Sequence, residues 1–268
     1  MVNNPHIHFI SGLPRSGSTL LAAILKQNPN FVAGMTSPVA TIYRHTEDAM
    51  SRRQETAVFV DNEIRTRMLK GVFAAYYGDA WGVKTIFDTN RMWCARTGAL
   101  ASLFPESKII CCVRDVGQIM ESFERIYQGS PFEPSGVYGY DTSGTVFNRV
   151  RSLAGGDGVV GFALNALREA HASANKDRLL LIEYDDLCKA PQEAIARVYK
   201  HINAPRFKHN FNHVEYSAGE FDAQIGAPGL HEVSGPVEVK KRDRVLPPSL
   251  FADFANDQFW RPGPWRDS

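Results

Sequence analysis

The sequence has little excess charge of either sign and no long apolar run. Thirty Lys and Arg residues against 29 Asp and Glu residues leave a formal net charge of +1, which argues against a broad cationic surface for nucleic acid or anionic lipid. No stretch approaches the roughly 20 consecutive apolar residues of a membrane-spanning helix. We therefore expect neither nucleic acid nor a membrane as a partner.

The N-terminal residues MVNNPHIHFI show no basic segment followed by an apolar run, which is the pattern of a secretory signal. We therefore expect a cytoplasmic protein. The sequence leaves the oligomeric state open, a homodimer included.

Cysteine is also scarce, and its spacing argues against a metal centre or a disulfide framework. None of the four cysteines, Cys94, Cys111, Cys112 and Cys188, forms a CxxC pair. Cys111 and Cys112 are adjacent in an apolar run, and neighbouring residues of a strand point to opposite faces. We interpret them as small buried side chains.

Apolar strand patterns alternate with helical patterns along the 268 residues. Strands that are apolar throughout are typical of a parallel sheet covered on both faces. The sequence thus predicts an α/β fold, a single domain over 1–268 with a central parallel β-sheet flanked by helices. The predicted strands are 6–11, 81–85, 108–113 and 178–184, and the predicted helices are 18–27, 60–77, 90–104, 116–128, 161–175 and 191–202.

Two stretches, 129–158 and 207–248, lack this regular pattern and contain aromatic residues. They are either surface connections or the walls and lid of a substrate cleft, because a parallel sheet places its ligands beyond the carboxyl ends of its strands.

The first predicted strand leads into a glycine-marked loop and a helix start, FISGLPRSGSTLL. Gly12 and Gly17 have the GxxxxG spacing of a phosphate-binding loop, but Ser18 stands where nucleoside triphosphate loops carry lysine. Backbone N–H groups and the dipole of the following helix still favour an anion there. The alternative is a glycine-rich turn that binds nothing.

Arg15 supplies a fixed positive charge near the apex of this loop, and Ser16, Ser18 and Thr19 add hydroxyl donors. A triphosphate with its metal fits poorly, because the lysine is missing and no strand ends in a free aspartate suited to Mg²⁺. The loop favours a metal-free phosphate ester or a phosphate–sulfate anhydride.

A second candidate anion site follows the third predicted strand, in CVRDVGQIMESF. Arg114 ends the strand, and Ser122 lies about two turns into the next helix, so guanidinium and hydroxyl together could hold a second phosphate. Taken alone, this pattern is more typical of a structural salt bridge.

The two motifs together, GLPRSGSTLL and FPESKIICCVRDVGQIMESF, resemble the sulfotransferase superfamily. Members use 3′-phosphoadenosine-5′-phosphosulfate (PAPS) as the sulfuryl donor and have a P-loop-like nucleotide-binding fold. The resemblance implies that the first loop binds the 5′-phosphosulfate and that Arg114 and Ser122 bind the 3′-phosphate. It implies a PAPS-dependent sulfotransferase that needs no metal.

Within the superfamily the chain looks most like the tyrosylprotein-sulfotransferase branch and its bacterial relatives. The features are the PRSGST loop, Lys84 at the end of the second predicted strand, and Tyr184 in LLLIEYDDL. The resemblance implies a catalytic role for Lys84 beside Arg15 and places Tyr184 near the nucleotide. It also implies a late serine and basic residue over the donor, for which Ser234 with Lys240 or Lys241 are the candidates.

The general bases known in the family are absent from their positions, since no carboxylate lies between Asn28 and Arg44 and Ile86 replaces a histidine. Asp88 is the nearest candidate, although it is equally suited to cap the next helix. Further candidates for the base, ranked after Asp88, are His45, Glu47 and His231.

The acceptor stays open between a small molecule, a sugar and a peptide tyrosine, through a hydroxyl or an amine. A P-loop-like kinase or NTPase and a catalytically inactive nucleotide-binding protein remain the alternatives. Basic residues would suit a peptide groove, and aromatic residues would line a closed pocket. The former are Arg44, Arg52 and Arg53, and the latter Phe132, Tyr138, Tyr140 and Phe147.

Overall fold

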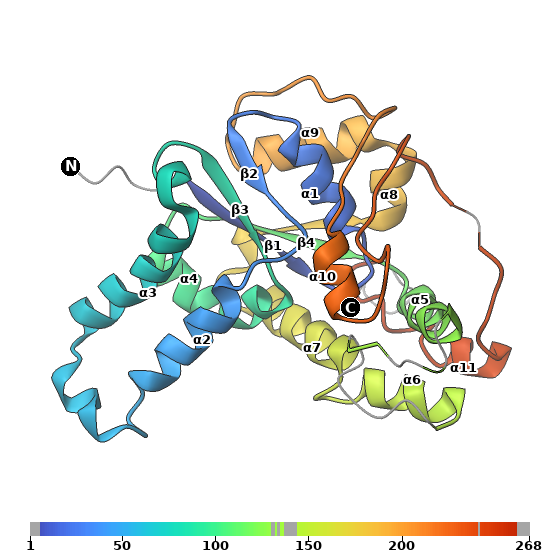
Figure 1. The fold of residues 1–268 in the computed structure, drawn as a ribbon, viewed down its shortest axis with the longest axis horizontal. Coiled ribbons are helices and arrows are strands. Elements are labelled where there is room, and N and C mark those ends of the chain that lie inside the picture. The colour runs from blue at the N-terminus through green and yellow to red at the C-terminus, as the bar shows by residue number, and fades with distance from the viewer. Residues whose placement is uncertain (1–5, 130–131, 133–134, 137–143, 241, 262–268) are drawn as a thin grey trace, which may run out of the picture.

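A five-stranded, fully parallel sheet forms the centre of the computed structural model, which describes residues 6–129, 132, 135–136, 144–240 and 242–261 (Figure 1). The strand order is β2-β3-β1-β4-β5. The predicted α/β fold with a central parallel sheet is confirmed. The strands are β1 (Ile7–Gly12), β2 (Phe31–Ala33), β3 (Thr85–Thr89), β4 (Ile109–Val113) and β5 (Leu179–Glu183).

Helices cover both faces of this sheet (Figure 1). One face packs mainly against α1 (Ser18–Lys26) and α9 (Pro191–His201), and the other against α3 (Asn62–Tyr77), α5 (Val116–Gly129) and α7 (Val159–Ala172). Cys111 lies in one apolar cluster and Cys112 in the other, and both are fully buried, as the strand alternation predicts.

The remaining helical segments are shorter or lie at the edges of the sheet. They are α2 (Val39–Ala49), α4 (Thr97–Leu103), α6 (Val146–Ala154), α8 (Tyr184–Lys189), α10 (Gly219–Gln224) and α11 (Pro248–Ala252), with 3₁₀ turns η1 (Glu55–Phe59), η2 (Gly78–Ala80), η3 (Arg91–Arg96) and η4 (Lys176–Arg178).

The second predicted strand, 81–85, is wrong by four residues, because β3 runs from Thr85 to Thr89. Val83 is 78% exposed, whereas Asp88 inside the strand is fully buried and pairs in register with Phe9 of β1. Because β3 contains the acidic residue Asp88, its sequence does not show the apolar pattern that predicts a buried strand. The three-residue strand β2 was not predicted at all.

Of the two irregular stretches, the first is partly helical. Residues 146–154 form α6, whose N-terminus is capped by the Thr145 hydroxyl and which buries Val150 and Leu153, so the prediction of a loop there is wrong. The second stretch is largely irregular, with the short helix α10 and a bridge between Tyr216 and Val233.

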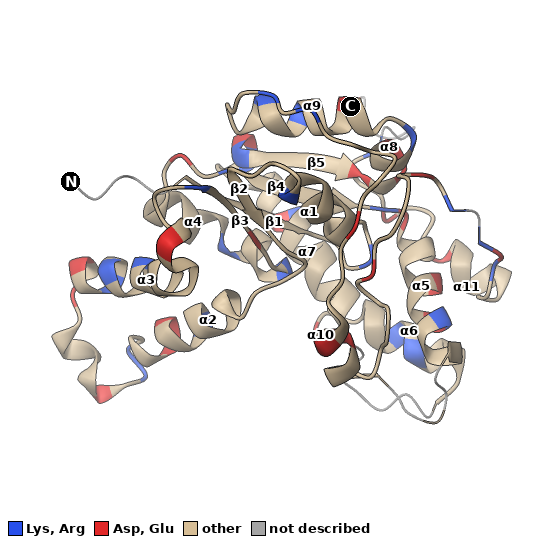
Figure 2. Cartoon of the chain, turned by 45° about the horizontal axis from the view of Figure 1, so that its top comes forward, with Lys and Arg blue, Asp and Glu red and all other residues tan. Residues whose placement is uncertain are grey.

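α3 carries one acidic residue in its first turn, Glu63, and then the basic residues Arg65, Arg67 and Lys70 (Figure 2). Within the ranges that the structure describes, no helix is both long and apolar enough to cross a bilayer.

Candidate functional site

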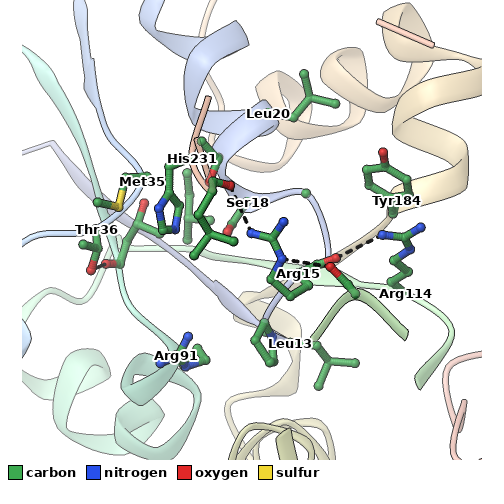
Figure 3. A pocket seen from close by; sticks show the side chains of 18 of the residues that line it. Leu13, Arg15, Ser18, Leu20, Met35, Thr36, Arg91, Arg114, Tyr184 and His231 are labelled. Atoms are coloured by element: carbon green, nitrogen blue, oxygen red, sulfur yellow. Dashed lines mark hydrogen bonds between the residues drawn. The ribbon is translucent and has the colours of Figure 1, made fainter. Parts of the chain in front are cut away.

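A cavity of about 410 Å³ opens at the carboxyl ends of the central strands. Segments that follow β1, β3, β4 and β5 line it, together with the second irregular stretch, as expected for a parallel sheet. Its volume lies within the range of small-ligand sites. The lining includes Arg15, Ser18, Thr19, Met35, Thr36, Arg91, Arg114, Ser122, Tyr184, Leu230, His231 and Arg242 (Figure 3).

The loop after β1 depends on two glycines with left-handed backbone. Gly12 has φ 98°, and a Cβ there would lie 2.2 Å from the carbonyl oxygen of Cys112. Gly17 has φ 94°, and a Cβ there would lie 2.7 Å from the Tyr184 ring. Only glycine fits these positions without strain, so the loop can pass close to β4 and α8 and present the N-terminus of α1 to the cavity.

Ser18 and Thr19 begin α1 and line the cavity, as predicted. Their free backbone N–H groups and the helix dipole favour an anion at this point. The Ser16 hydroxyl lies instead inside the loop. It is 2.5 Å from the carbonyl oxygen of Leu13 and 2.9 Å from that of Cys112, so it stabilises the loop and the predicted hydroxyl contact to an anion is wrong.

Arg15 joins the two predicted anion motifs. Its Nε donates to Ser122 Oγ over 3.1 Å, and its Nη1 donates to the carbonyl oxygen of Leu230 over 3.2 Å. Arg15 itself has a positive φ of 57°, an uncommon conformation for a residue other than glycine. The guanidinium is therefore fixed between α5 and the C-terminal segment.

Arg114 lies beside the same loop, directly after β4. Its Nε donates to Gln118 Oε1 over 3.0 Å, and its Nη1 donates to the carbonyl oxygen of Arg15 over 3.4 Å. The guanidinium carbon stands 4.2 Å from the centre of the Tyr184 ring. Arg114, Ser122 and Tyr184 thus lie together on one side of the cavity, as predicted.

Burial and neighbouring positive charges lower the pKa values of Arg15 and Arg114. Desolvation, followed by the positive charges of Arg242 and Arg114, lowers the pKa of Arg15 to about 10. Desolvation likewise lowers the pKa of Arg114, and Arg242 adds to the effect. A bound anion would offset the positive charges of Arg114 and Arg242 that lower the pKa of Arg15.

Arg242 was missed by sequence reasoning, which favoured Lys240 or Lys241 with Ser234. Lys240 and Ser234 are exposed and are not among the cavity-lining residues, and Lys241 lies outside the described residues. Arg242 reaches the cavity from the same segment. Arg242 is exposed as well, and neither residue periodicity nor a motif marks which basic residue of an irregular segment lines the cavity.

Arg91 was also missed, while Lys84 is corrected. Lys84 precedes β3 at the amino end of the sheet, is exposed, and does not line the cavity, so its predicted place at the carboxyl end beside the cleft is wrong. Arg91 follows the carboxyl end of β3 and faces the cavity from below in Figure 3. Desolvation lowers the pKa of Arg91.

Asp88 is buried away from the cavity. Its carboxylate accepts hydrogen bonds from the hydroxyls of Ser37 and Tyr77 and from Trp93 Nε1, over 2.6, 2.7 and 2.7 Å. Desolvation raises the pKa of Asp88 while these hydrogen bonds lower it. The residue holds β3, α2, α3 and η3 together, and the structure gives it no access to an acceptor.

His231 differs from the other base candidates because it lines the cavity. Its Nδ1 lies 2.6 Å from Asp222 Oδ1, and its backbone N–H donates to Asp222 Oδ2 over 2.8 Å. His45 and Glu47 lie on α2 outside the lining residues, where Glu47 pairs with Arg96 at 3.2 Å.

The two irregular stretches contribute to the cavity to different extents. The second supplies Phe221, Ile225, Leu230 and Val233, and the first supplies Gly136. Of the aromatic residues predicted to line it, Phe132 and Phe147 are 96% and 41% exposed and are not among the lining residues, while Tyr138 and Tyr140 lie outside the described residues. Arg44, Arg52 and Arg53 are exposed and do not line it.

In the described part of the chain, no group of three or more His, Cys, Asp and Glu side chains is arranged to hold a metal ion.

Comparison with known proteins identifies relatives of this fold and sequence. The model of a family described as "Sulfotransferase family" matches residues 8–208. The nodulation protein NoeE of Sinorhizobium fredii is 28% identical over 213 residues, which are 72% of this chain and 49% of NoeE. The chain thus spans about half the length of this curated relative.

Solved structures resemble the chain over nearly its whole length. The sulfotransferase domain of the Synechococcus PCC 7002 olefin synthase has a TM-score of 0.56 at 18% identity, covering 94% of this chain and 96% of that one. The sulfotransferase domain of the curacin biosynthetic pathway has a TM-score of 0.53 at 17% identity, covering 96% and 92%. At these identities the likeness concerns the fold.

Proposed function

The chain belongs to the sulfotransferase family, and we propose that it transfers a sulfuryl group from PAPS to a hydroxyl or amine of an acceptor. The observation that carries this proposal is the contact between Arg15 and Ser122. It joins the loop suited to a phosphosulfate to the motif suited to a second phosphate. A donor with a phosphosulfate at one end and a separate phosphate at the other matches this pair.

The donor would be held by residues from several strand ends. The N-terminus of α1, with Ser18 and Thr19, and the guanidinium of Arg15 would bind the 5′-phosphosulfate. Arg114 and Ser122 would bind the 3′-phosphate, with Tyr184 beside Arg114. Arg242, whose positive charge lowers the pKa values of Arg15 and Arg114, would complete the anion site in place of Lys240.

When bound, PAPS supplies an activated sulfuryl group whose leaving group is a phosphate. By analogy with phosphoryl transfer, the protein chiefly positions the reactants and stabilises charge that develops on the departing oxygen. Arg15 is suited to this because its guanidinium is fixed by two hydrogen bonds. Arg91 provides a second cation at the same edge of the sheet, the role first expected of Lys84.

The acceptor would enter on the side of Met35, Thr36 and His231. Figure 3 shows these residues on one side of Arg15, with Arg114 and Tyr184 on the other. Phe221, Ile225 and Leu230 add apolar side chains to a cavity that also has polar lining residues. A small acceptor is favoured over a peptide because the cavity volume lies in the range of small-ligand sites.

The direct test is transfer of labelled sulfate from PAPS to a panel of alcohols, phenols, sugars, amines and tyrosine peptides. We expect label on at least one class, with none when the donor is replaced by inorganic sulfate. Binding of the donor without transfer to any acceptor would contradict the proposed activity and favour the inactive nucleotide-binding protein.

A further inference from the structure

We propose that His231, held in place by Asp222, takes the proton from a hydroxyl acceptor, and that the physiological acceptor is a hydroxyl that stays protonated at neutral pH, such as an alcohol. This inference rests on the proposed sulfuryl transfer and adds to it the base and the class of acceptor. No residue of the two motifs discussed above supplies that base.

Asp222 and Phe221 hold the imidazole of His231 in place. Asp222 is 1% exposed. Its Oδ1 lies 2.6 Å from the ring Nδ1 of His231, and its Oδ2 accepts a hydrogen bond from the backbone N–H of His231 over 2.8 Å. The Phe221 ring packs edge-on against the imidazole with centroids 5.5 Å apart. The ring is thus held from two sides in one orientation.

The contact with Asp222 determines which ring nitrogen of His231 carries the proton. An ionised carboxylate can only accept hydrogen bonds, so Nδ1 carries the proton toward Asp222. In the neutral ring the lone pair then lies on Nε2. Across the described residues, neither a hydrogen bond nor an ion pair engages Nε2, and the side chain is 17% exposed.

His231 lies beside Arg15, on the side proposed for the acceptor. Leu230, the residue before His231, accepts the hydrogen bond from Arg15 Nη1, so the histidine lies directly beside the loop proposed for the phosphosulfate. Figure 3 places His231 with Met35 and Thr36 on the side of Arg15 that faces away from Arg114. A nucleophile that attacks sulfur opposite the departing phosphate would lie on this side.

Other candidate bases fit less well. Asp88 is fully buried and accepts three hydrogen bonds. Glu232 lines the cavity too, but it is exposed, and an exposed carboxylate is a weaker base toward an alcohol than an imidazole. Asp222 contacts the ring, and Glu232 and Arg15 are charged residues that line the same cavity.

The proposed step is balanced as follows. The acceptor O–H proton moves to His231 Nε2, and the oxygen lone pair forms a bond to sulfur. The bond between sulfur and the 5′-phosphate oxygen breaks, and its electron pair leaves with adenosine 3′,5′-bisphosphate. An alcohol needs this base because its proton is weakly acidic, whereas a strongly acidic phenol is ionised already.

The test compares His231→Gln with His213→Gln. His213 forms a similar pair with Glu215, at 3.1 Å, but both side chains are about two-thirds exposed and outside the cavity, so the variant serves as a matched control. We expect His231→Gln to lower turnover with an alcohol roughly 10²–10⁴-fold and to bind adenosine 3′,5′-bisphosphate as the wild type does. The control should change neither quantity.

The class of acceptor gives a second readout that a purely structural role would not change. The loss in His231→Gln should be large for alcohols and small for an acidic nitrophenol, and the fall in rate at acidic pH should disappear in the variant. Asp222→Asn, which can no longer fix the tautomer, should lower turnover with alcohols more than it raises KM.

The outcomes separate the two proposals. If the wild type neither binds the bisphosphate nor transfers sulfate, the proposed function is wrong. If it does both, but His231→Gln retains full turnover with alcohols, or loses alcohols and nitrophenols equally, the assignment of His231 is wrong. Loss in Glu232→Gln without loss in His231→Gln would assign the base to Glu232 instead.

Discussion

Arg15 Nε donates a hydrogen bond to Ser122 Oγ over 3.1 Å, although 107 positions separate the two residues in the chain. The contact unites the loop after β1 with helix α5. It also fixes Arg15, which is proposed to act at the sulfur–oxygen bond of the donor that breaks. Two further contacts reinforce this arrangement, from Arg15 to Leu230 and from Arg114 to the backbone of Arg15.

Replacing Arg15 should depress turnover more than donor binding. We expect Arg15→Ala to lower kcat by about 10²–10³-fold, the usual loss for a group that stabilises charge in the transition state. Arg15→Lys should recover little, since an ammonium cannot reproduce the planar fork that reaches Ser122 and Leu230. Steady-state kinetics with PAPS measure both, and exposed Arg52→Ala is the control. Unchanged kcat in Arg15→Ala would remove it from the mechanism.

Arg242 and Lys240 offer a matched pair on one segment. Only Arg242 lines the cavity and shares the electrostatic field of Arg15 and Arg114. Arg242→Ala should weaken binding of adenosine 3′,5′-bisphosphate about 10- to 100-fold, as expected for a charge-assisted contact. Lys240→Ala should leave it unchanged. Calorimetric titration measures both, and the reverse pattern would return the role to Lys240.

Asp88 should matter for stability and not for chemistry. Asp88→Ala leaves the donors of Ser37, Tyr77 and Trp93 without their acceptor, so we expect a loss of about 2–4 kcal/mol in the free energy of unfolding. Turnover per folded molecule should persist, as it should in Lys84→Ala. Denaturant unfolding and kinetics check this. A fully stable, inactive Asp88→Asn would reinstate Asp88 as the base.

Much of the donor site could be predicted from the sequence because it depends on local patterns. Glycines, hydroxyls and arginines that directly follow buried strands meet at one edge of a parallel sheet, which is why Arg15, Ser18, Thr19 and Arg114 lie together. The place of Tyr184 beside them was implied by the resemblance to the sulfotransferase superfamily.

The remaining site residues depend on information that short patterns do not contain. The boundary of β3 was misplaced because its buried Asp88 is compensated by partners from distant segments, and with that error Lys84 was chosen in place of Arg91. Arg242 lies in an irregular segment whose path is set by tertiary contacts, such as those of Asp222 and Tyr216. His231, in the same segment, was a candidate base, but the sequence did not distinguish it from His45 and Glu47.

Because His8 is buried, we expect the folded protein to lose stability in mild acid. It is buried in β1, and its Nδ1 accepts a hydrogen bond from the backbone N–H of Lys108 over 3.1 Å. Burial, followed by the nearby positive charges, lowers the pKa of His8 from 6.5 to about 4. Between these values the unfolded chain binds a proton that the folded protein does not, so stability falls as the pH falls.

The shift corresponds to about 3 kcal/mol between pH 7 and pH 4. His8→Asn keeps an acceptor for Lys108 without a titrating group, so its free energy of unfolding should depend less on pH across this interval. The exposed His213→Asn is the control. Equal pH dependence in wild type and His8→Asn, followed by denaturant unfolding, would contradict the assignment to His8.

The central claim, a site built for a phosphosulfate donor that also carries a 3′-phosphate, is tested most directly by thermal unfolding with adenosine 3′,5′-bisphosphate. At about 100 times its dissociation constant, a ligand adds about 2.7 kcal/mol, or roughly 5–10 °C in Tm for a chain of this size. We predict this shift for the bisphosphate and a smaller one for adenosine 5′-monophosphate, with the difference abolished in Arg114→Ala. Stabilisation by ATP with Mg²⁺ but not by the bisphosphate would contradict the account.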